Sequence, residues 1–100
     1  MEAIFNKDGR LLSVKVSGRL DTISSNDLMA KVKETLDDNV RDVVVDCSEL
    51  TYISSSGLRV LMTIYKQTVP YEGSLTLRNL TQQVGEVLNI TGMANLFTIE

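Results

Sequence analysis

The sequence contains no histidine, and its only cysteine is Cys47. Without histidine the chain lacks the commonest general base at neutral pH, which excludes every serine or cysteine triad that depends on imidazole. One cysteine can form neither an internal disulfide nor a Cys-x-x-Cys metal pair. The glycine-rich nucleotide motifs, the zinc-protease motif and the calcium-binding loop are also missing. We therefore predict a protein that is not an enzyme and that carries no metal and no cofactor.

Long apolar runs are missing as well. The longest wholly aliphatic runs are as short as residues 43–45, whereas a bilayer-spanning helix needs ~20 apolar residues. Met1 is followed by Glu2 and by no apolar stretch, so we expect neither membrane insertion nor a signal peptide, and a cytoplasmic location. With 13 acidic and 10 basic residues the net charge is −3, and no basic cluster attracts phosphate backbones, so nucleic acid is not an expected partner.

What is present is an ordinary globular composition, with 43% apolar and 23% charged residues. This composition excludes a disordered or low-complexity chain. A chain of 100 residues accommodates one compact domain with a radius of gyration of about 13 Å. We expect a single domain over residues 1–100.

Several segments have the patterns of β-strands. Residues 12–17 alternate between apolar and polar side chains, as in a strand with one buried face. The Asp8-Gly9 step before it is expected to adopt the positive φ angles of a tight turn, which predicts a hairpin with an earlier strand around residues 3–5. Residues 42–46 contain three successive β-branched valines without alternation, which is typical of a central strand, and a loop with Ser48, Thr51 and Tyr52 is expected after it. Two further strands are expected at residues 74–78 and 96–99.

Three helices are predicted from apolar residues spaced three or four apart. The first covers residues 25–37 and has several capping candidates in residues 24–27. The second follows a serine cluster and stops at Pro70, and the third ends at Gly92. Alternation of these helices with the strands predicts an α/β fold, in which about three to four helices pack on a mixed sheet of about five strands.

The serine cluster, Ser54-Ser55-Ser56-Gly57, precedes the second helix. Its hydroxyls lie where backbone N–H groups lack partners, so one serine is readily explained as an N-cap worth ~1 kcal/mol. One cap, however, needs only one serine. The positive end of the helix dipole also stabilises an anion, so the position suits either a phosphoserine or a bound phosphate or nucleotide. A ligand site would normally contain several basic residues or additional glycines around the phosphate, but Arg59 is the one basic residue nearby in sequence. A phosphorylation-controlled binding module is therefore favoured over a small-ligand module.

Three segments together resemble a known family. They are residues 18–21 (GRLD), 43–61 (VVVDCSELTYISSSGLRVL) and 89–97 (NITGMANLF). The second segment is similar to the signature of the STAS domain, and within that family to the bacterial anti-sigma-factor antagonists. Their pattern is an aliphatic strand, Asp-x-Ser, and then Asp-Ser-Ser/Thr-Gly-Leu. The resemblance covers nearly the whole chain and implies a STAS-like domain.

The resemblance implies a regulatory partner rather than a reaction. Such a protein binds an anti-sigma factor that is a serine kinase of the histidine-kinase-like type, and so frees a sigma factor. By this resemblance the kinase phosphorylates Ser55, which releases the partner, and a phosphatase restores the hydroxyl. Asp21 falls on a family aspartate near that serine, whereas Ser54 stands where the family has another aspartate and Arg19 where an acid is frequent. We expect the partner-binding residues to be Asp21, Ser54, Ser56, Gly57, Leu58 and Arg59.

A second functional class is a response-regulator receiver with Asp46 as its phospho-acceptor. That interpretation requires an acidic pair after the first strand and a lysine after a late strand, and only Asp21 is found. A structural role is favoured for Asp46: we expect its carboxylate to accept loop N–H bonds and to brace the turn toward Ser55. Cys47 is expected to be a small buried apolar residue. Leu20, Ile23 and Met29 could form a partner surface, although apolar residues at this spacing are more often core.

Overall fold

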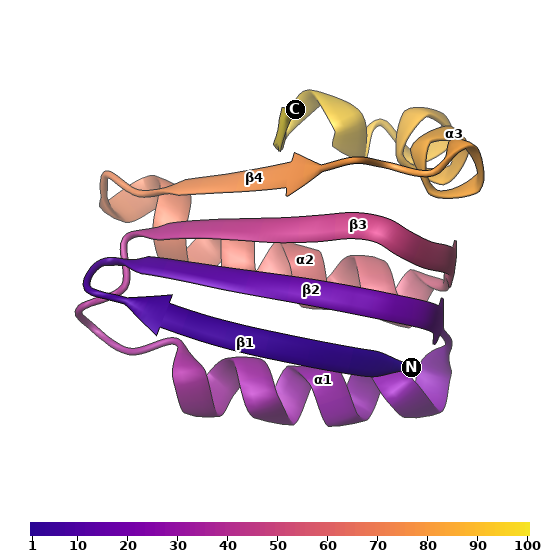
Figure 1. Cartoon of the computed structure of the whole chain (residues 1–100). Helices are drawn as coiled ribbons and strands as arrows, with labels where there is room; N and C mark the ends of the chain where they lie inside the picture. Colours follow the sequence, from indigo (N-terminus) through magenta and orange to yellow (C-terminus); the bar gives the residue numbers. More distant parts are fainter.

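A five-stranded sheet organises the chain, and the computed structural model describes all 100 residues (Figure 1). The strands are β1 Glu2–Asp8, β2 Leu11–Leu20, β3 Asp42–Ile53, β4 Ser74–Arg78 and β5 Thr98–Ile99. They are arranged in the order β1-β2-β3-β4-β5, with β1 antiparallel to β2 and all later pairs parallel. The predicted α/β fold with a mixed sheet is confirmed.

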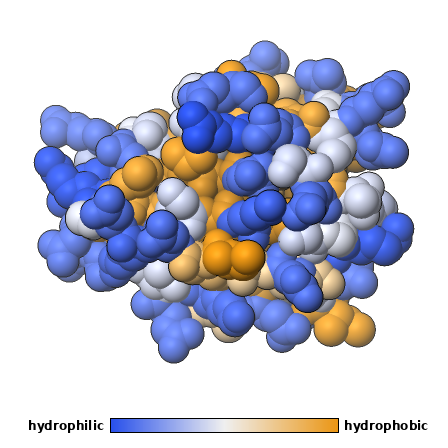
Figure 2. Space-filling view, viewed as in Figure 1, coloured by the Kyte–Doolittle hydropathy of each residue, from blue (hydrophilic) through white to orange (hydrophobic).

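Three α-helices connect the parallel strands. They are α1 Thr22–Thr35, α2 Ser55–Thr68 and α3 Gln82–Thr91, and two short 3₁₀ turns follow at Val69–Tyr71 and Met93–Asn95. Figure 1 shows α2 behind the sheet, α1 next to it and below β1 in this view, and α3 beside the end of β4. The face turned toward the viewer carries no helix, and it is largely hydrophilic with a few hydrophobic patches (Figure 2). None of the helices has the length and apolar character needed to cross a membrane.

The core lies between the sheet and its helices. In β2, Leu12, Val14 and Val16 are at most 3% exposed, which confirms the predicted alternation. One cluster contains 21 buried apolar residues. Burial of apolar surface stabilises the fold by about 25 cal/mol per Å², and it is the main force that holds the helices on the sheet. The radius of gyration is 12.2 Å, close to the expectation for one domain of this length.

The predicted hairpin is present, but its turn is placed one residue later than the Asp8-Gly9 step indicates. Asp8 and Leu11 pair across it, so the turn consists of Gly9 and Arg10 alone. Gly9 has a φ of 61°, and Asp8 stays in the extended strand, so the expectation of positive φ at both Asp8 and Gly9 was wrong. A single glycine at the first turn position is enough to close a two-residue hairpin.

The first helix starts earlier than its apolar spacing indicates. Asp21, not a residue of 24–27, is the N-cap of α1, and its carboxylate accepts a hydrogen bond from the Ser24 backbone N–H at 2.9 Å. The Ser24 hydroxyl in turn accepts from the Asp21 backbone N–H at 3.0 Å, which completes a capping box. These two bonds give partners to the backbone N–H groups of Asp21 and Ser24, so the helix begins at Thr22.

The central strand is longer than its β-branched run. β3 continues through the expected loop to Ile53 because two irregularities in its pairing with β2 each add a residue on the β3 side. After Cys47 the buried positions are Leu50 and Ile53, three apart instead of two. Loss of the two-residue period is the reason that this half of the strand was predicted as loop.

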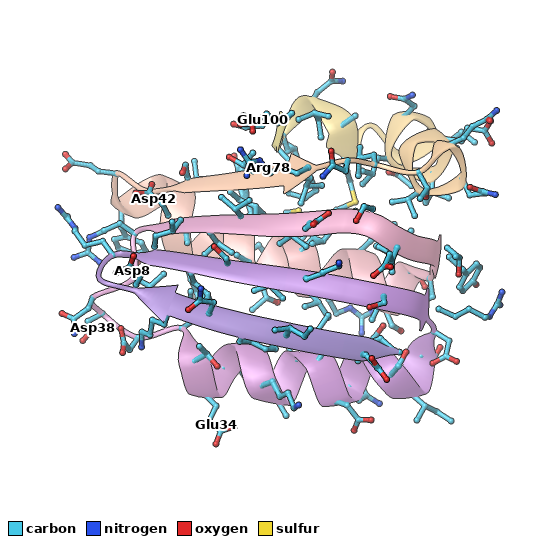
Figure 3. The ribbon with its side chains drawn as sticks, in the orientation of Figure 1. Asp8, Glu34, Asp38, Asp42, Arg78 and Glu100 are labelled. Atoms are coloured by element: carbon cyan, nitrogen blue, oxygen red, sulfur yellow. The ribbon has the colours of Figure 1, made fainter.

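The C-terminal third follows the sequence prediction more closely. β4 has the predicted bounds, Thr81 caps α3, and Gly92, with a φ of 77°, ends it. The last strand is shorter than expected: Leu96 ends the 3₁₀ turn with helical backbone angles, and only Thr98 and Ile99 pair with β4. An ion pair of 2.6 Å between Arg78 and Glu100 ties the chain end to β4 (Figure 3).

Candidate functional site

The candidate site forms where two neighbouring strands end. Leu20 of β2 pairs in parallel with Ile53 of β3, so α1 and α2 begin side by side. The Ser54 backbone N–H donates to the Leu20 carbonyl at 2.9 Å, which joins the two strand ends. Asp21 and Ser54 therefore follow adjacent paired residues, and they are the N-caps of the two helices.

The three serines differ in their contacts, which shows which of them caps the helix and which are free. The Ser54 hydroxyl accepts a hydrogen bond from the Gly57 backbone N–H at 3.2 Å, so Ser54 is the cap of α2. Ser55 is the first residue of the helix and is exposed, and Ser56 is half-buried. Neither the Ser55 nor the Ser56 hydroxyl makes a hydrogen bond within the chain, which leaves the Ser55 oxygen accessible and uncommitted.

Gly57 allows the helix to start close to the sheet. A Cβ atom at this position would lie 2.7 Å from the Ile53 Cγ1 atom and 2.9 Å from the Leu20 Cδ2 atom, distances that real Cβ atoms essentially never show. Leu58, the next residue, is 8% exposed and belongs to the core cluster. The packing of these two buried residues fixes the position of the serines, whereas the side chain of Arg59 is exposed.

Asp21 is a charged carboxylate at the edge of the site. Its hydrogen bonds from the Ser24 backbone and the Ser24 hydroxyl hold its pKa below the usual value of 3.8, with smaller contributions from the positive charges of the N-terminus and Arg19. The carboxylate is fully exposed and already holds the first turn of α1. The site therefore combines one fixed negative charge with a free hydroxyl.

Arg19 and Tyr52 form a contact that the sequence did not reveal. The two residues pair across β2 and β3, and the Arg19 guanidinium carbon lies 4.2 Å from the centre of the Tyr52 ring. This is a cation–π contact at a surface position. Only the strand register could have revealed it, and the two irregularities in β3 hide that register.

Asp46 lies away from the site. It sits in the first half of β3, so the expectation that it ends a strand was wrong. Its carboxylate accepts hydrogen bonds from the Ser48 backbone N–H at 3.0 Å and the Asn79 side chain at 3.3 Å, and the Ser48 bond is the main cause of its lowered pKa. The predicted structural role is thus found, but it braces β3 against the end of β4 and not the turn toward Ser55.

Two other expectations can be checked by burial. Cys47 is 1% exposed, and desolvation, with a smaller effect of Asp46, raises the pKa of its thiol to about 12, which confirms it as a small buried apolar residue. Leu20 is 2% exposed and Met29 packs against the core, so only Ile23, at 77% exposure, remains available for a partner.

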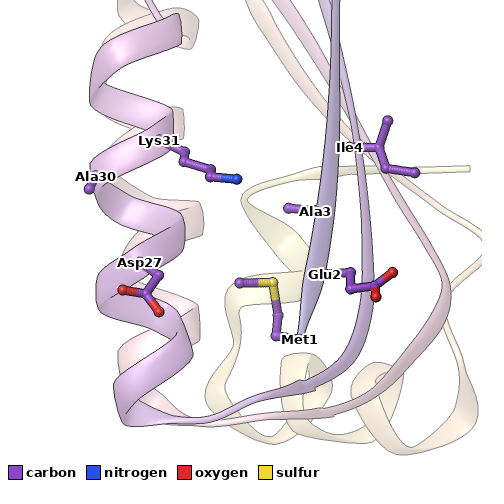
Figure 4. A pocket seen from close by; sticks show the side chains of 7 residues that line it. All are labelled: Met1, Glu2, Ala3, Ile4, Asp27, Ala30 and Lys31. Atoms are coloured by element: carbon purple, nitrogen blue, oxygen red, sulfur yellow. The ribbon is translucent and has the colours of Figure 1, made fainter.

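The surface hollows of the molecule lie elsewhere. A groove of about 610 Å³ runs between the start of β1 and α1, with Met1 and Ala3 facing Asp27 and Lys31 (Figure 4). No hollow of the protein is lined by residues 54–59, and the only one that includes Leu20 and Ile53 is an apolar gap inside the core. The serines stand on an open surface, which suits modification or contact with a protein better than enclosure of a small ligand.

Comparisons with known proteins identify relatives that match nearly the whole chain. The family model described as "Mlab, STAS domain" matches residues 5–98. BtrV of Bordetella bronchiseptica, a candidate anti-sigma factor antagonist, is 35% identical over 92 residues, which cover 92% of this chain and 78% of BtrV. The anti-sigma-B factor antagonist of Staphylococcus aureus is 24% identical over 90 residues, with 90% of this chain and 83% of the relative covered.

Solved structures show the same fold. An anti-sigma factor antagonist from Mycobacterium paratuberculosis superposes with a TM-score of 0.86 at 19% identity, covering 98% of this chain and 83% of the other. SpoIIAA in its unphosphorylated form superposes with a TM-score of 0.85 at 17% identity, covering 99% and 88%. With the matching family model and the relative at 35% identity, these results show that the chain belongs to the STAS-domain family of anti-sigma factor antagonists.

Proposed function

We propose that this protein binds an anti-sigma factor with serine-kinase activity and thereby releases a sigma factor, until phosphorylation of Ser55 ends the interaction. The observation that carries the proposal is the Ser55 hydroxyl, which is exposed at the first residue of α2 and makes no hydrogen bond in the chain. The neighbouring Ser54 already caps the helix, so Ser55 is not needed for the fold. The relatives named as anti-sigma factor antagonists support the choice of partner.

The proposed contact surface surrounds this hydroxyl. Asp21 and Arg59 are exposed, and Ser54 and Ser56 are half-buried, so all four are available to a partner. Gly57 and Leu58 are buried, so we assign them the role of positioning the surface rather than of touching the partner. The exposed Ile23 on the first turn of α1 extends the surface with an apolar side chain.

A phosphate at Ser55 would change this surface more than the fold. It adds about −1.5 to −2 charges and three acceptor oxygens at a helix start, where the dipole and free N–H groups favour an anion. The first turn of α2 contains no acidic residue to oppose it. In this mechanism the protein is the substrate and regulator in the cytoplasm, the kinase supplies the catalysis, and a phosphatase restores the hydroxyl.

The proposal can be tested with purified components. The protein is mixed with the kinase-type anti-sigma factor encoded nearest its gene, with ATP and magnesium, and intact mass and fragment spectra locate any phosphate. We expect one phosphate on Ser55, none on a Ser55→Ala variant, and normal labelling of a Ser56→Ala control. Full labelling of Ser55→Ala would refute the assignment, and labelling of Asp46 would support a receiver instead.

A further inference from the structure

Arg59 is an unpaired cation one helical turn after Ser55. Its side chain is exposed and takes part in none of the ion pairs or side-chain hydrogen bonds of the chain. Residues four apart on a helix lie on the same face, with Cβ atoms about 5–6 Å apart. The guanidinium can therefore reach the space above the Ser55 hydroxyl without any movement of the backbone.

Nothing else on α2 competes for this guanidinium. The helix, Ser55–Thr68, contains no aspartate or glutamate, and its other cation, Lys66, lies in the last turn. Around the helix start, Arg19 is stacked on the Tyr52 ring and the Asp21 carboxylate is bound by Ser24. Arg59 is thus the cation on the same helix face that is free to meet a new negative charge at position 55.

We infer that Arg59 captures the phosphate of phosphorylated Ser55 within the same helix. This inference rests on the proposed function and deepens its regulation. A guanidinium presents a fork of N–H donors that matches two phosphate oxygens, and such charge-assisted bonds are shorter and stronger than neutral ones. Before phosphorylation Arg59 is available to the partner, and afterwards the phosphate engages it, so one modification removes two contacts from the surface.

The test installs phosphoserine at position 55 during translation, so it needs neither a kinase nor a partner. The phosphorus NMR shift is followed against pH for the phosphorylated wild type and for phosphorylated Arg59→Gln. A nearby cation favours the dianion, so loss of Arg59 should raise the second phosphate pKa, ordinarily about 6, by at least about 0.3, a twofold change in proton affinity. Arg59→Lys, which keeps the charge but loses the fork, should fall between the two.

Lys66→Gln is the matched control. It removes the same charge from the same helix, but 11 residues beyond Ser55, or about 16 Å along the axis, and so beyond the screening length of about 8 Å at physiological salt. We expect it to move the phosphate pKa by less than about 0.1. Thermal melts of the unphosphorylated variants check that these exposed substitutions leave the fold intact.

Two results would overturn the inference. Equal shifts for Arg59→Gln and Lys66→Gln would show a general charge effect, and a shift found only in Arg19→Gln would assign the phosphate to the residue now stacked on Tyr52. Because the phosphate is supplied synthetically, failure here leaves the kinase experiment untouched. Failure of the kinase experiment likewise leaves the intramolecular contact to be judged on its own.

Discussion

Replacement of Gly57 by alanine tests whether the serine site depends on close packing of α2 on the sheet. The added methyl group would lie under 3.0 Å from both Ile53 and Leu20, which are 4% and 2% exposed and cannot swing into solvent. Overpacking of this kind costs about 1–3 kcal/mol. Because two buried side chains must move, we expect a cost in the upper part of this range, about 2–3 kcal/mol. Alanine recovers about 0.8–1.0 kcal/mol of helix propensity relative to glycine, so the expected net loss is about 1–2 kcal/mol.

The same substitution at Gly85 provides the control. This residue lies inside α3, and a Cβ atom there would meet nothing within 4 Å. Gly85→Ala should therefore gain stability by about 0.8–1.0 kcal/mol from propensity alone. The two variants differ in sign because one position is packed against the core and the other faces open space.

Thermal and urea unfolding can separate these outcomes. For a domain of this size 1 kcal/mol shifts the melting temperature by about 4–8 °C, so Gly57→Ala should melt roughly 5–15 °C lower and Gly85→Ala several degrees higher. An unchanged urea m-value would confirm that the effect is on stability and not on compactness. A Gly57→Ala protein as stable as the wild type would refute the close approach of the helix to the sheet.

Three further predictions concern the site and its surroundings. Because the pKa of Asp21 is lowered in the folded state, Asp21→Asn should reduce the urea midpoint at neutral pH. The difference in midpoint between the wild type and the variant should vanish as the pH falls from 3.8 through the lower pKa of the folded state. A difference that persists in acid would contradict a charge-based cap. Cys47, with its pKa raised to about 12, should not react with a thiol reagent at mildly alkaline pH until the protein is unfolded, and rapid absorbance change in the native state would disprove its burial. Ser55→Asp should alter partner affinity far more than the melting temperature, and a largely unfolded circular dichroism spectrum would exclude a local switch.

Much of the fold could be predicted because its strands and helices obey simple periods. The two-residue alternation of β2 and the three- and four-residue spacing in α2 and α3 reflect burial of one face, and each was placed correctly. The predicted bounds of α1 and β3 were wrong because a local interaction there overrode the regular spacing of apolar residues. The capping box of Asp21 and Ser24 started α1 early, and the irregular pairing of β3 changed the spacing of its buried residues.

The candidate site was predictable in residue type but not in arrangement. The serine cluster before a helix was visible, yet the choice of Ser54 as cap follows from its hydrogen bond to the Gly57 backbone. The separation of Ser55 at the surface from Leu58 in the core depends on how α2 is rotated on the sheet. That rotation is set by the packing of α2 against β2 and β3, and this packing cannot be read from the sequence of α2 alone.

Ser54 is one position at which this chain differs from the family pattern, and we expect it to affect how fast Ser55 is phosphorylated. Serine and aspartate are about equal as N-caps, so Ser54→Asp should keep the bond to the Gly57 N–H, now 3.2 Å long, and leave the fold stable. What changes is a negative charge beside the acceptor hydroxyl, next to the carboxylate of Asp21.

If the family aspartate helps to position the acceptor hydroxyl, this chain should be phosphorylated slowly and Ser54→Asp should be phosphorylated faster. Binding of the unmodified protein to its kinase should change by less than about tenfold, roughly 1.4 kcal/mol, since only one charge is added to the surface. Ser54→Asn is the matched control, because it caps the helix equally well without the charge and should not accelerate transfer. The opposing argument is that kinase and substrate have adapted together, so that a second carboxylate beside Asp21 repels the incoming phosphate. Single-turnover rates for the three proteins with one kinase decide between these arguments, and an unchanged or lower rate for Ser54→Asp would show that the charge has no positioning role here.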